Sequence, residues 1–156
     1  MGKLLPIYLN DHLAGATLGV ELARRLRGSN QADPEFGPAL SELCAEIEAD
    51  RETLEAVMER FDIGRSKLKP FVAVIGERVG RLKLNGRLRG YSPLSRLDEL
   101  EILQLGVTGK LRLWLALEQT HADDLADFEL GALAERASGQ LRRLEALHLK
   151  AAALAL

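Results

Sequence analysis

The sequence is poor in the residues and patterns on which several protein classes depend. One cysteine, Cys44, excludes an internal disulfide and any metal or iron–sulfur site built from several cysteines. No apolar run reaches the ~20 residues of a membrane-spanning helix, and the opening apolar stretch is too short for a signal peptide. The net charge of −2 and the pI near 6.0 give no global basic field for nucleic acid. We therefore expect a cytoplasmic protein that neither spans a membrane nor binds nucleic acid.

Aromatic residues make up only 4% of the chain, and leucine and alanine supply most of the 47% that is hydrophobic. That composition favours helix over strand. No run of β-branched residues and no sustained alternation of apolar and polar residues predicts a strand. The length of 156 residues suits one domain of ordinary size. We therefore predict an all-α protein in which residues 1–156 form a single helical-bundle domain.

Capping and turn residues divide the chain into four long helices and one short helix after Ser66. The long helices are expected over residues 4–27, from Pro34 or Pro38 to Phe61, from the Ser92-Pro93 cap to residue 119, and from a break near 121–127 to residue 152. Each long helix after the first carries leucines at helical spacing on one face, as a bundle requires. Residues 65–92 are long enough to cross from one end of the bundle to the other. A single-crossover bundle is therefore predicted, with a plain up-down bundle plus an extra helix as the alternative.

Two segments resemble a known group of proteins. The opening segment Tyr8–Ala16, YLNDHLAGA, and the closing segment Arg136–Gln140, RASGQ, are similar to a group of uncharacterised bacterial proteins. We place that group among the ferritin-like bundles. The resemblance implies a ferritin-like four-helix bundle with a short crossover helix, and it carries no activity.

Ferritin-like bundles often hold two metal ions through Glu-x-x-His motifs on two helices. Such motifs occur here at Glu118-x-x-His121 and at Glu145-x-x-His148. On antiparallel helices, Glu118 lies about six residues from the connecting turn and His148 about twenty-four, which separates them by roughly 27 Å at 1.5 Å per residue. Two ions in a shared site lie only ~4 Å apart. We therefore predict no shared metal centre and no cofactor, and leave open a single weakly bound metal ion at His121 or His148.

Three polar residues fall on faces that are otherwise apolar: His12 in the first helix, and Asp50 and Arg51 in the second. Counted from the turn between these helices, His12 lies opposite residue 51. Because a buried carboxylate needs a partner, we predict that His12 meets Asp50 or Arg51 in or near the core. The pair is interpreted as structural, and a ligand-binding or proton-transfer role is the alternative. Small residues on the His12 track should let a neighbouring helix approach closely: Ala16, Gly19 and Ala23.

Charge is strongly segregated along the chain. Residues 31–59 carry nine acidic residues and one basic residue, a net charge of −8, whereas residues 60–96 carry ten basic and two acidic residues, a net charge of +8. We expect the two segments to attract one another, within the chain or across a dimer. The alternative is that residues 60–96 bind an anionic polymer or a lipid surface. Only Tyr91 is interleaved there for stacking on bases, which does not favour nucleic acid.

No motif predicts catalysis. The segment Gly106–Leu111, GVTGKL, resembles a phosphate-binding loop but has the wrong spacing and no Ser or Thr after the lysine. Cys44 lies on an apolar face and is predicted to be an inert core thiol. We predict a non-catalytic helical bundle that acts through protein–protein contacts, as a homodimer or with another protein partner. The alternative is a ferritin-like metal-binding or oxidoreductase protein that uses the histidines named above.

Overall fold

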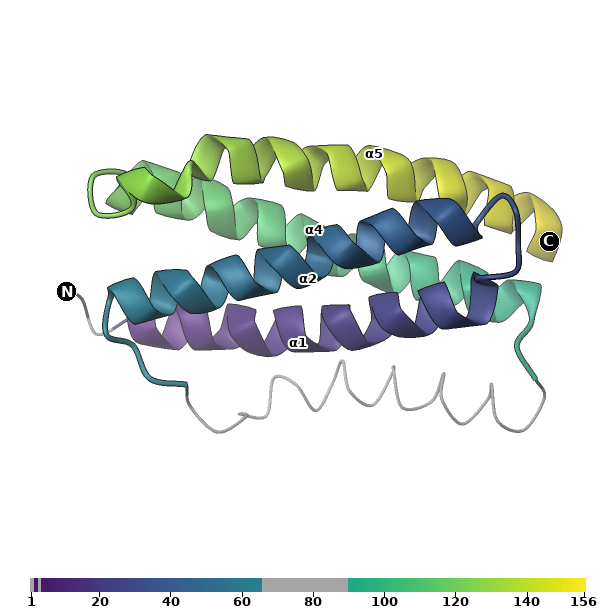
Figure 1. Ribbon diagram of the computed structural model, residues 1–156, viewed down its shortest axis with the longest axis horizontal. Coiled ribbons are helices and arrows are strands. Elements are labelled where there is room, and N and C mark those ends of the chain that lie inside the picture. Colours follow the sequence, from purple (N-terminus) through teal and green to yellow (C-terminus); the bar gives the residue numbers. More distant parts are fainter. Residues whose placement is uncertain (1, 3, 66–89) are drawn as a thin grey trace.

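Four α-helices lie side by side in the computed structural model, which describes residues 2, 4–65 and 90–156 (Figure 1). Their bounds are α1 at Leu5–Asn30, α2 at Gly37–Arg60, α4 at Pro93–His121 and α5 at Leu130–Ala155, with a short 3₁₀ helix, η1, at Ala126–Phe128. The described residues contain no strand, so the predicted all-α class is confirmed. The short helix predicted after Ser66 falls within residues 66–89 and lies outside the described residues.

Local capping groups fix two of the helix starts. The hydroxyl of Ser92 accepts the backbone N–H three residues on, at 3.1 Å, and Pro93 occupies the first turn of α4, as predicted. Ahead of α2, the carboxylate of Asp33 accepts the backbone N–H groups of Glu35 and Phe36, at 2.9 and 3.1 Å. These bonds close the tight connection between α1 and α2.

Two turns place particular demands on their residues. A Cβ at Gly37 would lie 2.9 Å from the backbone oxygen of Gln31, so the turn into α2 leaves no room for a side chain. Before α5, Glu129 adopts the left-handed conformation with φ of 48°. Because η1 and Glu129 intervene, α5 begins at Leu130, beyond the break that the sequence places near residues 121–127.

The directions of the helices follow from contacts at the two ends of the bundle. At one end Arg96, early in α4, pairs with Asp33 ahead of α2 at 3.4 Å. At the other end Arg60, the last residue of α2, pairs with Asp127 in η1 at 2.9 Å. Helices α2 and α4 therefore run in the same direction, with α1 and α5 running opposite to them (Figure 1). The end of α2 and the start of α4 consequently lie at opposite ends of the bundle.

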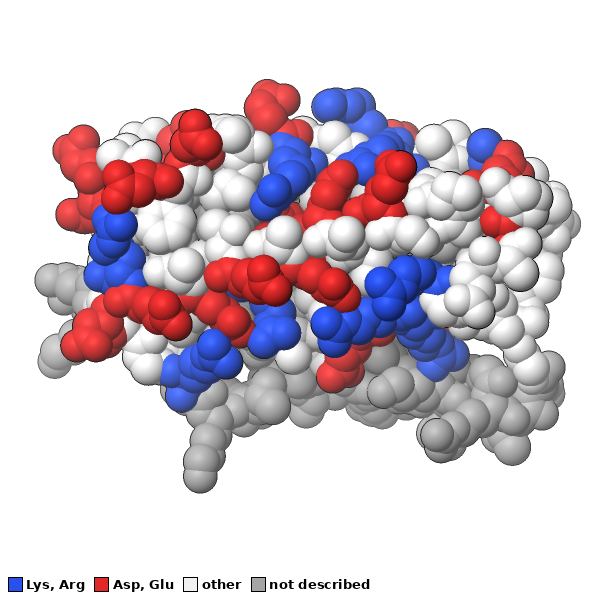
Figure 2. Space-filling model, viewed as in Figure 1, with Lys and Arg blue, Asp and Glu red and all other residues white. Residues whose placement is uncertain are grey.

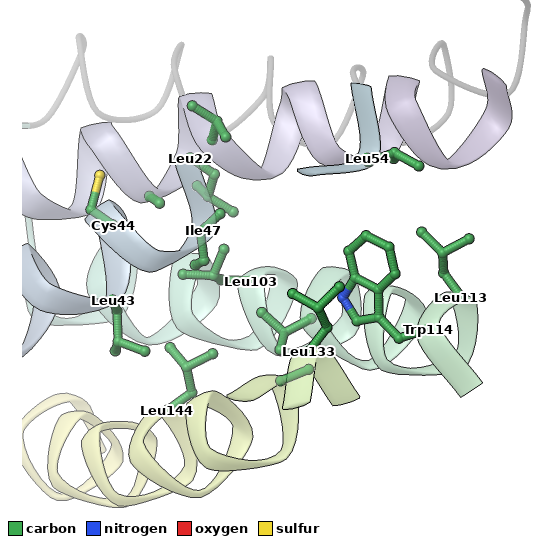
Figure 3. Close-up of a cluster of buried hydrophobic side chains, with 14 of the residues drawn as sticks. Leu22, Leu43, Cys44, Ile47, Leu54, Leu103, Leu113, Trp114, Leu133 and Leu144 are labelled. Carbon is green, nitrogen blue, oxygen red and sulfur yellow. The ribbon is translucent and has the colours of Figure 1, made fainter. Parts of the chain in front are cut away.

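Leucine stripes from the four helices form the core. Figure 3 shows buried side chains meeting between the helices, with the fully buried Trp114 extending from α4 into the interior. The predicted stripes are buried as expected in α2, at Leu40, Leu43, Cys44, Ile47, Leu54, Val57 and Met58. No described helix is long and apolar enough to cross a membrane.

The four helix pairs are not packed equally. Helix α1 packs against α2 and α4, and α5 packs mainly against α4, whereas the backbones of α2 and α5 approach each other at few points. Long charged side chains cover the line between α2 and α5, and Figure 2 shows acidic and basic groups interleaved there. Charged side chains therefore line the solvent-facing side of the joint between α2 and α5.

Candidate functional site: a cavity beside a buried ion-pair network

A partly open cavity of about 410 Å³ lies between α1, α2 and α4. Its apolar walls include Ile47 and Leu54 from α2 and Leu103 and Val107 from α4. Polar side chains border it as well, among them His12, Asp50, Arg51 and Lys110. Cavities of roughly 300–1,000 Å³ with apolar walls and a few polar groups are typical of small-molecule sites.

Four glycines in mid-helix line this cavity, Gly15 and Gly19 on α1 and Gly106 and Gly109 on α4. A Cβ built at any of them would have no described atom within 4 Å beyond its own helical turn. At Gly19, one of the small residues from which a close helix approach is predicted, no described neighbour comes within 4 Å of the added Cβ. A glycine inside a helix costs roughly 0.5–1 kcal/mol relative to alanine. The helices thus carry a destabilising residue type at four positions where no neighbour in the described part of the chain packs closely.

Asp50, on α2, is the polar centre of the interior, and its side chain is only 1% exposed. One carboxylate oxygen accepts from the guanidinium of Arg136. The other accepts from the ammonium of Lys110 and from the amide nitrogen of Gln140, the latter at 3.0 Å. Because Lys110 belongs to α4 and the other two donors to α5, one carboxylate joins three helices. Three donors are what a buried carboxylate needs in place of water.

Gln140 extends these bonds to a second carboxylate. This fully buried side chain accepts from Lys110 Nζ at 2.5 Å and donates to Glu46 at 3.0 Å. Arg143 donates to the same oxygen of Glu46 at 2.5 Å. We call the connected set the Asp50 network, and its members are Glu46, Asp50, Lys110, Arg136, Gln140 and Arg143. With three basic and two acidic members, its formal charge is +1.

Burial sets the protonation of the groups around the cavity. It lowers the pKa of the Lys110 ammonium, and the neighbouring Asp50 carboxylate opposes that change. Burial likewise lowers the pKa of His12, against the opposing charge of Asp11, so His12 is neutral at pH 7. Burial raises the pKa of Glu46, but hydrogen bonds from its Asp50-network partners outweigh burial and hold that pKa below its ordinary value.

Two hydrogen-bond donors of cavity-lining residues have no acceptor among the described residues. They are the indole N–H of Trp114, which is fully buried, and the Nε of Arg51. Arg51 uses a terminal nitrogen instead, on Glu55 at 2.7 Å. A buried donor without an acceptor is rare in folded proteins. Both atoms are themselves buried, although the residues that carry them border the cavity.

The structure brings His12, Asp50 and Arg51 to the same cavity, as their predicted proximity implies. The hydrogen bonds of the Asp50 carboxylate nevertheless run to α4 and α5, and the ring of His12 lies edge-on to Tyr8 with centroids 4.5 Å apart. Sequence reasoning missed Lys110, Arg136 and Gln140 as partners of Asp50. A polar Gln140 on the leucine stripe of α5 was the one available signal.

The two Glu-x-x-His motifs are not brought together. His121 packs edge-on against Phe61 near the end of α2, with centroids 5.4 Å apart. His148 instead faces Glu101 in the first third of α4, at 3.0 Å. Glu118 lies beside Gly131, and Glu145 is exposed on α5. Across residues 2, 4–65 and 90–156, no three histidine, cysteine or acidic side chains are placed to share a metal ion.

The described basic residues of the 60–96 segment are paired with acids. Arg65 meets Glu55 at 3.1 Å and Arg96 meets Asp33, so two of them contact the acidic 31–59 segment. Arg60 pairs with η1, and the other basic residues of this segment lie outside the described residues. Binding of an anionic polymer or lipid through this segment stays a prediction.

Two sequence features prove to be structural. Residues 106–111 lie within α4, so the segment that resembles a phosphate-binding loop is helical. Cys44 is buried, with its thiol 3.7 Å from Glu48, and burial raises its pKa, which disfavours the thiolate.

Comparisons with known proteins give no indication of the function. The chain matches no family model, no curated protein and no solved structure. The cavity and the Asp50 network therefore carry the functional argument.

Proposed function

We propose that this protein is a non-catalytic helical bundle that binds a small, largely apolar molecule in the cavity between α1, α2 and α4. The observation that carries the proposal is the open space of about 410 Å³ beside four mid-helix glycines. Alanine or leucine at those positions would stabilise the helices and fill the space. A molecule bound in the cavity explains why glycine occupies these four positions, which packing among the described residues does not explain.

Binding is favoured over catalysis because Asp50 and Lys110, the ion pair beside the cavity, are engaged with each other and with other protein groups. Lys110 donates to both Asp50 and Gln140, and its ammonium is thereby held in an ion pair. Both oxygens of Asp50 accept hydrogen bonds from protein donors. Neither group is free to serve as a nucleophile or a general base without first breaking the Asp50 network.

We also propose a ferritin-like topology with a short crossover helix in residues 66–89. The parallel course of α2 and α4, flanked by the antiparallel α1 and α5, supports it. A chain that leaves α2 at one end and enters α4 at the other has to travel the length of the bundle. That single long connection is the mark of ferritin-like bundles.

The sole tryptophan offers a direct test of the cavity, because Trp114 lines it. Titration with decanol should change the emission of Trp114 in a saturable way. The variant Gly19→Leu, which fills the cavity from α1, should abolish that change. The matched control Gly28→Leu, on the same helix but away from the cavity, should retain it. A wild-type protein that gives no saturable change, or equal responses from both variants, would refute the proposal.

Homodimerisation is a separate proposal, supported by exposed leucines where α4 begins and α5 ends. Leu94 is 52% exposed, Leu149 64% and Leu154 60%. Large apolar side chains gathered on one surface commonly mark an interface. Light scattering should give twice the chain mass of 17.1 kDa for the wild type and a monomer for Leu149→Glu combined with Leu154→Glu. A monomeric wild type would refute the dimer and leave the cavity proposal intact.

A further inference from the structure

The cavity is elongated along the helix axes. Its described lining residues extend from Tyr8 to Gly19 on α1 and from Leu103 to Trp114 on α4. On either helix this is a length of roughly 16 Å at 1.5 Å per residue. The volume of about 410 Å³ spread over that length gives a mean cross-section of roughly 25 Å², or a width of about 5–6 Å. Because packed carbon atoms lie ~4 Å apart, this width holds one hydrocarbon chain but not two side by side.

The four glycines form two pairs, each at one level of the cavity. Arg25 on α1 pairs with Glu99 on α4 at 2.5 Å, and this contact fixes the levels of the two antiparallel helices. Counted in opposite directions from that ion pair, the matching glycines are Gly15 with Gly109 and Gly19 with Gly106. The members of each pair agree in level to within ~1.5 Å. A side chain on either helix at these levels would therefore narrow the middle of the cavity.

The two ends of the cavity differ in polarity. Tyr8, Asp11 and His12 line the end at the start of α1, where Asp11 is exposed to solvent. The opposite end is lined by Ile47 of α2 and Leu103 of α4, which lie early in two parallel helices. The polar end of an occupant consequently belongs beside Tyr8, and its apolar chain extends past the glycine pairs towards Leu103.

The described charges beside the cavity balance, so they favour neither an anion nor a cation. The charged residues of its lining are two acids, Asp11 and Asp50, and two bases, Arg51 and Lys110. The side chains that ion pairs and the Asp50 network join to them are again three acids and three bases: Glu42, Glu46, Glu55, Arg65, Arg136 and Arg143. A charged head group would lose hydration without meeting a surplus of opposite charge. An uncharged head group avoids that cost.

The length of the cavity limits the length of the chain. Carbon–carbon bonds of ~1.5 Å at an angle of ~111° advance an extended chain by roughly 1.25 Å per carbon. A length of roughly 16 Å therefore holds about twelve carbons. The volume agrees, because a cavity of ~150 Å³ holds the six carbons of benzene and about 410 Å³ then holds at most roughly sixteen.

We propose that the occupant is an uncharged single-chain lipid of about twelve carbons, of the class of the medium-chain fatty alcohols. Its hydroxyl group lies at the Tyr8 end, and its extended chain lies between the glycine pairs. This assignment rests on the proposed binding function of the cavity and names the ligand class. It also makes the four glycines the residues that determine specificity, because they keep the cavity wide enough for a chain.

A series of alcohols tests the length of the chain. Calorimetric titrations near pH 7, below the solubility limit of each probe, measure the affinities of octanol, decanol and dodecanol. The affinity should rise about fourfold with each added methylene group, because each one is buried in the cavity. Emission of Trp114, which requires less ligand, should show no further gain for tetradecanol.

Probes with ten carbons separate width from charge. 1-Adamantanol has the carbon count and the hydroxyl group of decanol in a compact cage, and it should bind at least about tenfold more weakly because the cavity is one chain wide. Decanoate and decylamine keep the chain of decanol and change only the head group. Each should bind at least about fivefold more weakly than decanol, because neither charge meets a net opposite charge.

Glycine variants test the pairs from both helices. Gly19→Leu and Gly109→Leu fill the cavity from α1 and from α4, so each should abolish binding of decanol. The matched control Gly28→Leu, which lies outside the cavity, should retain the wild-type affinity. The double variant Gly19→Ala with Gly109→Ala favours the helical state and so stays folded, and it should weaken decanol about fivefold because two methyl groups occupy part of the space.

The outcomes distinguish this assignment from the proposed function. Binding of decanoate or decylamine as tight as that of decanol would overturn the uncharged class. Equal binding of 1-adamantanol, or an affinity that does not rise with chain length, would overturn the single extended chain. In each case, loss of binding in Gly19→Leu would still support a binding site in the cavity. Failure of every probe to bind would overturn the binding function itself.

Discussion

Removing the carboxylate of Asp50 tests the interior most directly. In Asp50→Ala, Lys110 and Gln140 lose a shared partner where little water reaches them, since the Lys110 side chain is only 14% exposed. Arg136 is 35% exposed and can turn towards solvent. An ion left unpaired in the interior costs about 3–5 kcal/mol, out of roughly 5–15 kcal/mol for a whole domain. We therefore expect the free energy of unfolding to fall by about 3–5 kcal/mol.

Urea denaturation followed by circular dichroism measures this loss. A slope of ~1–3 kcal/mol per molar urea is usual for a small protein, so the midpoint should fall by roughly 2 M. The double variant Asp50→Leu with Lys110→Met should recover at least about half of the loss, because apolar side chains then replace both charges. Glu52→Ala, an exposed acid on the same helix, should change stability by less than about 0.5 kcal/mol.

Two results would refute this reasoning. One is a loss below about 1 kcal/mol in Asp50→Ala with an unchanged slope, which would show that the ammonium of Lys110 finds water when its partner is gone. The other is a loss in the double variant that equals the sum of the losses in Asp50→Leu and in Lys110→Met, each measured alone. Strict additivity would mean that the two groups do not interact in the folded protein.

The remaining predictions concern glycine, histidine and tyrosine positions. Gly109→Ala should raise the free energy of unfolding, measured by urea denaturation, by about 0.5–1 kcal/mol, because its Cβ meets no described atom. Gly37→Ala should lower it by about 1–3 kcal/mol, because its Cβ would lie against the backbone of Gln31. Since burial lowers the pKa of His12, the unfolded chain binds its proton more tightly, and stability should rise as pH increases through that lowered pKa to ~6.5. His12→Leu should flatten this part of a stability–pH profile and change stability at pH 8 by less than about 1 kcal/mol. Burial raises the pKa of Tyr91 to about 12, so an ultraviolet titration should find a phenol that ionises near that pH and is absent in Tyr91→Phe. The same variant should lower the free energy of unfolding by about 1–2 kcal/mol, because buried Glu99 loses a hydrogen-bond donor.

Most of the fold could be predicted because its signals are local. The leucine spacing of α2 and the Ser92-Pro93 cap each act within a few residues, and both proved correct. The start of α5 was placed too early because neither glycine nor proline marks the left-handed Glu129. A turn of that kind depends on the packing around it and leaves no distinct signature in the sequence.

The site was predictable only where one hairpin defines it. Counting across the α1–α2 turn placed His12 opposite residue 51, and His12, Asp50 and Arg51 all line one cavity. The hydrogen-bond donors of Asp50 come from the α4–α5 hairpin. The way in which the two hairpins pack against each other has no short-range signal in the sequence. The cavity was hidden for another reason, since a glycine in a helix indicates equally a close neighbour or an empty space. Only the position of the facing helix distinguishes the two.

The hydrogen bonds of Gln140 also constrain how α5 can slide. Its apolar stripe repeats about every seven residues. A shift of two turns would therefore still present an apolar side chain at each core level, for example Leu144 at the level of Ala137. At the level of Asp50, however, the same shift would bring Leu133 or Leu147 in place of Gln140. A slipped assembly would trap an ion against hydrocarbon, whereas an all-leucine interior would barely distinguish the two arrangements. The buried ions thereby widen the energy gap between the folded chain and its misassembled rivals.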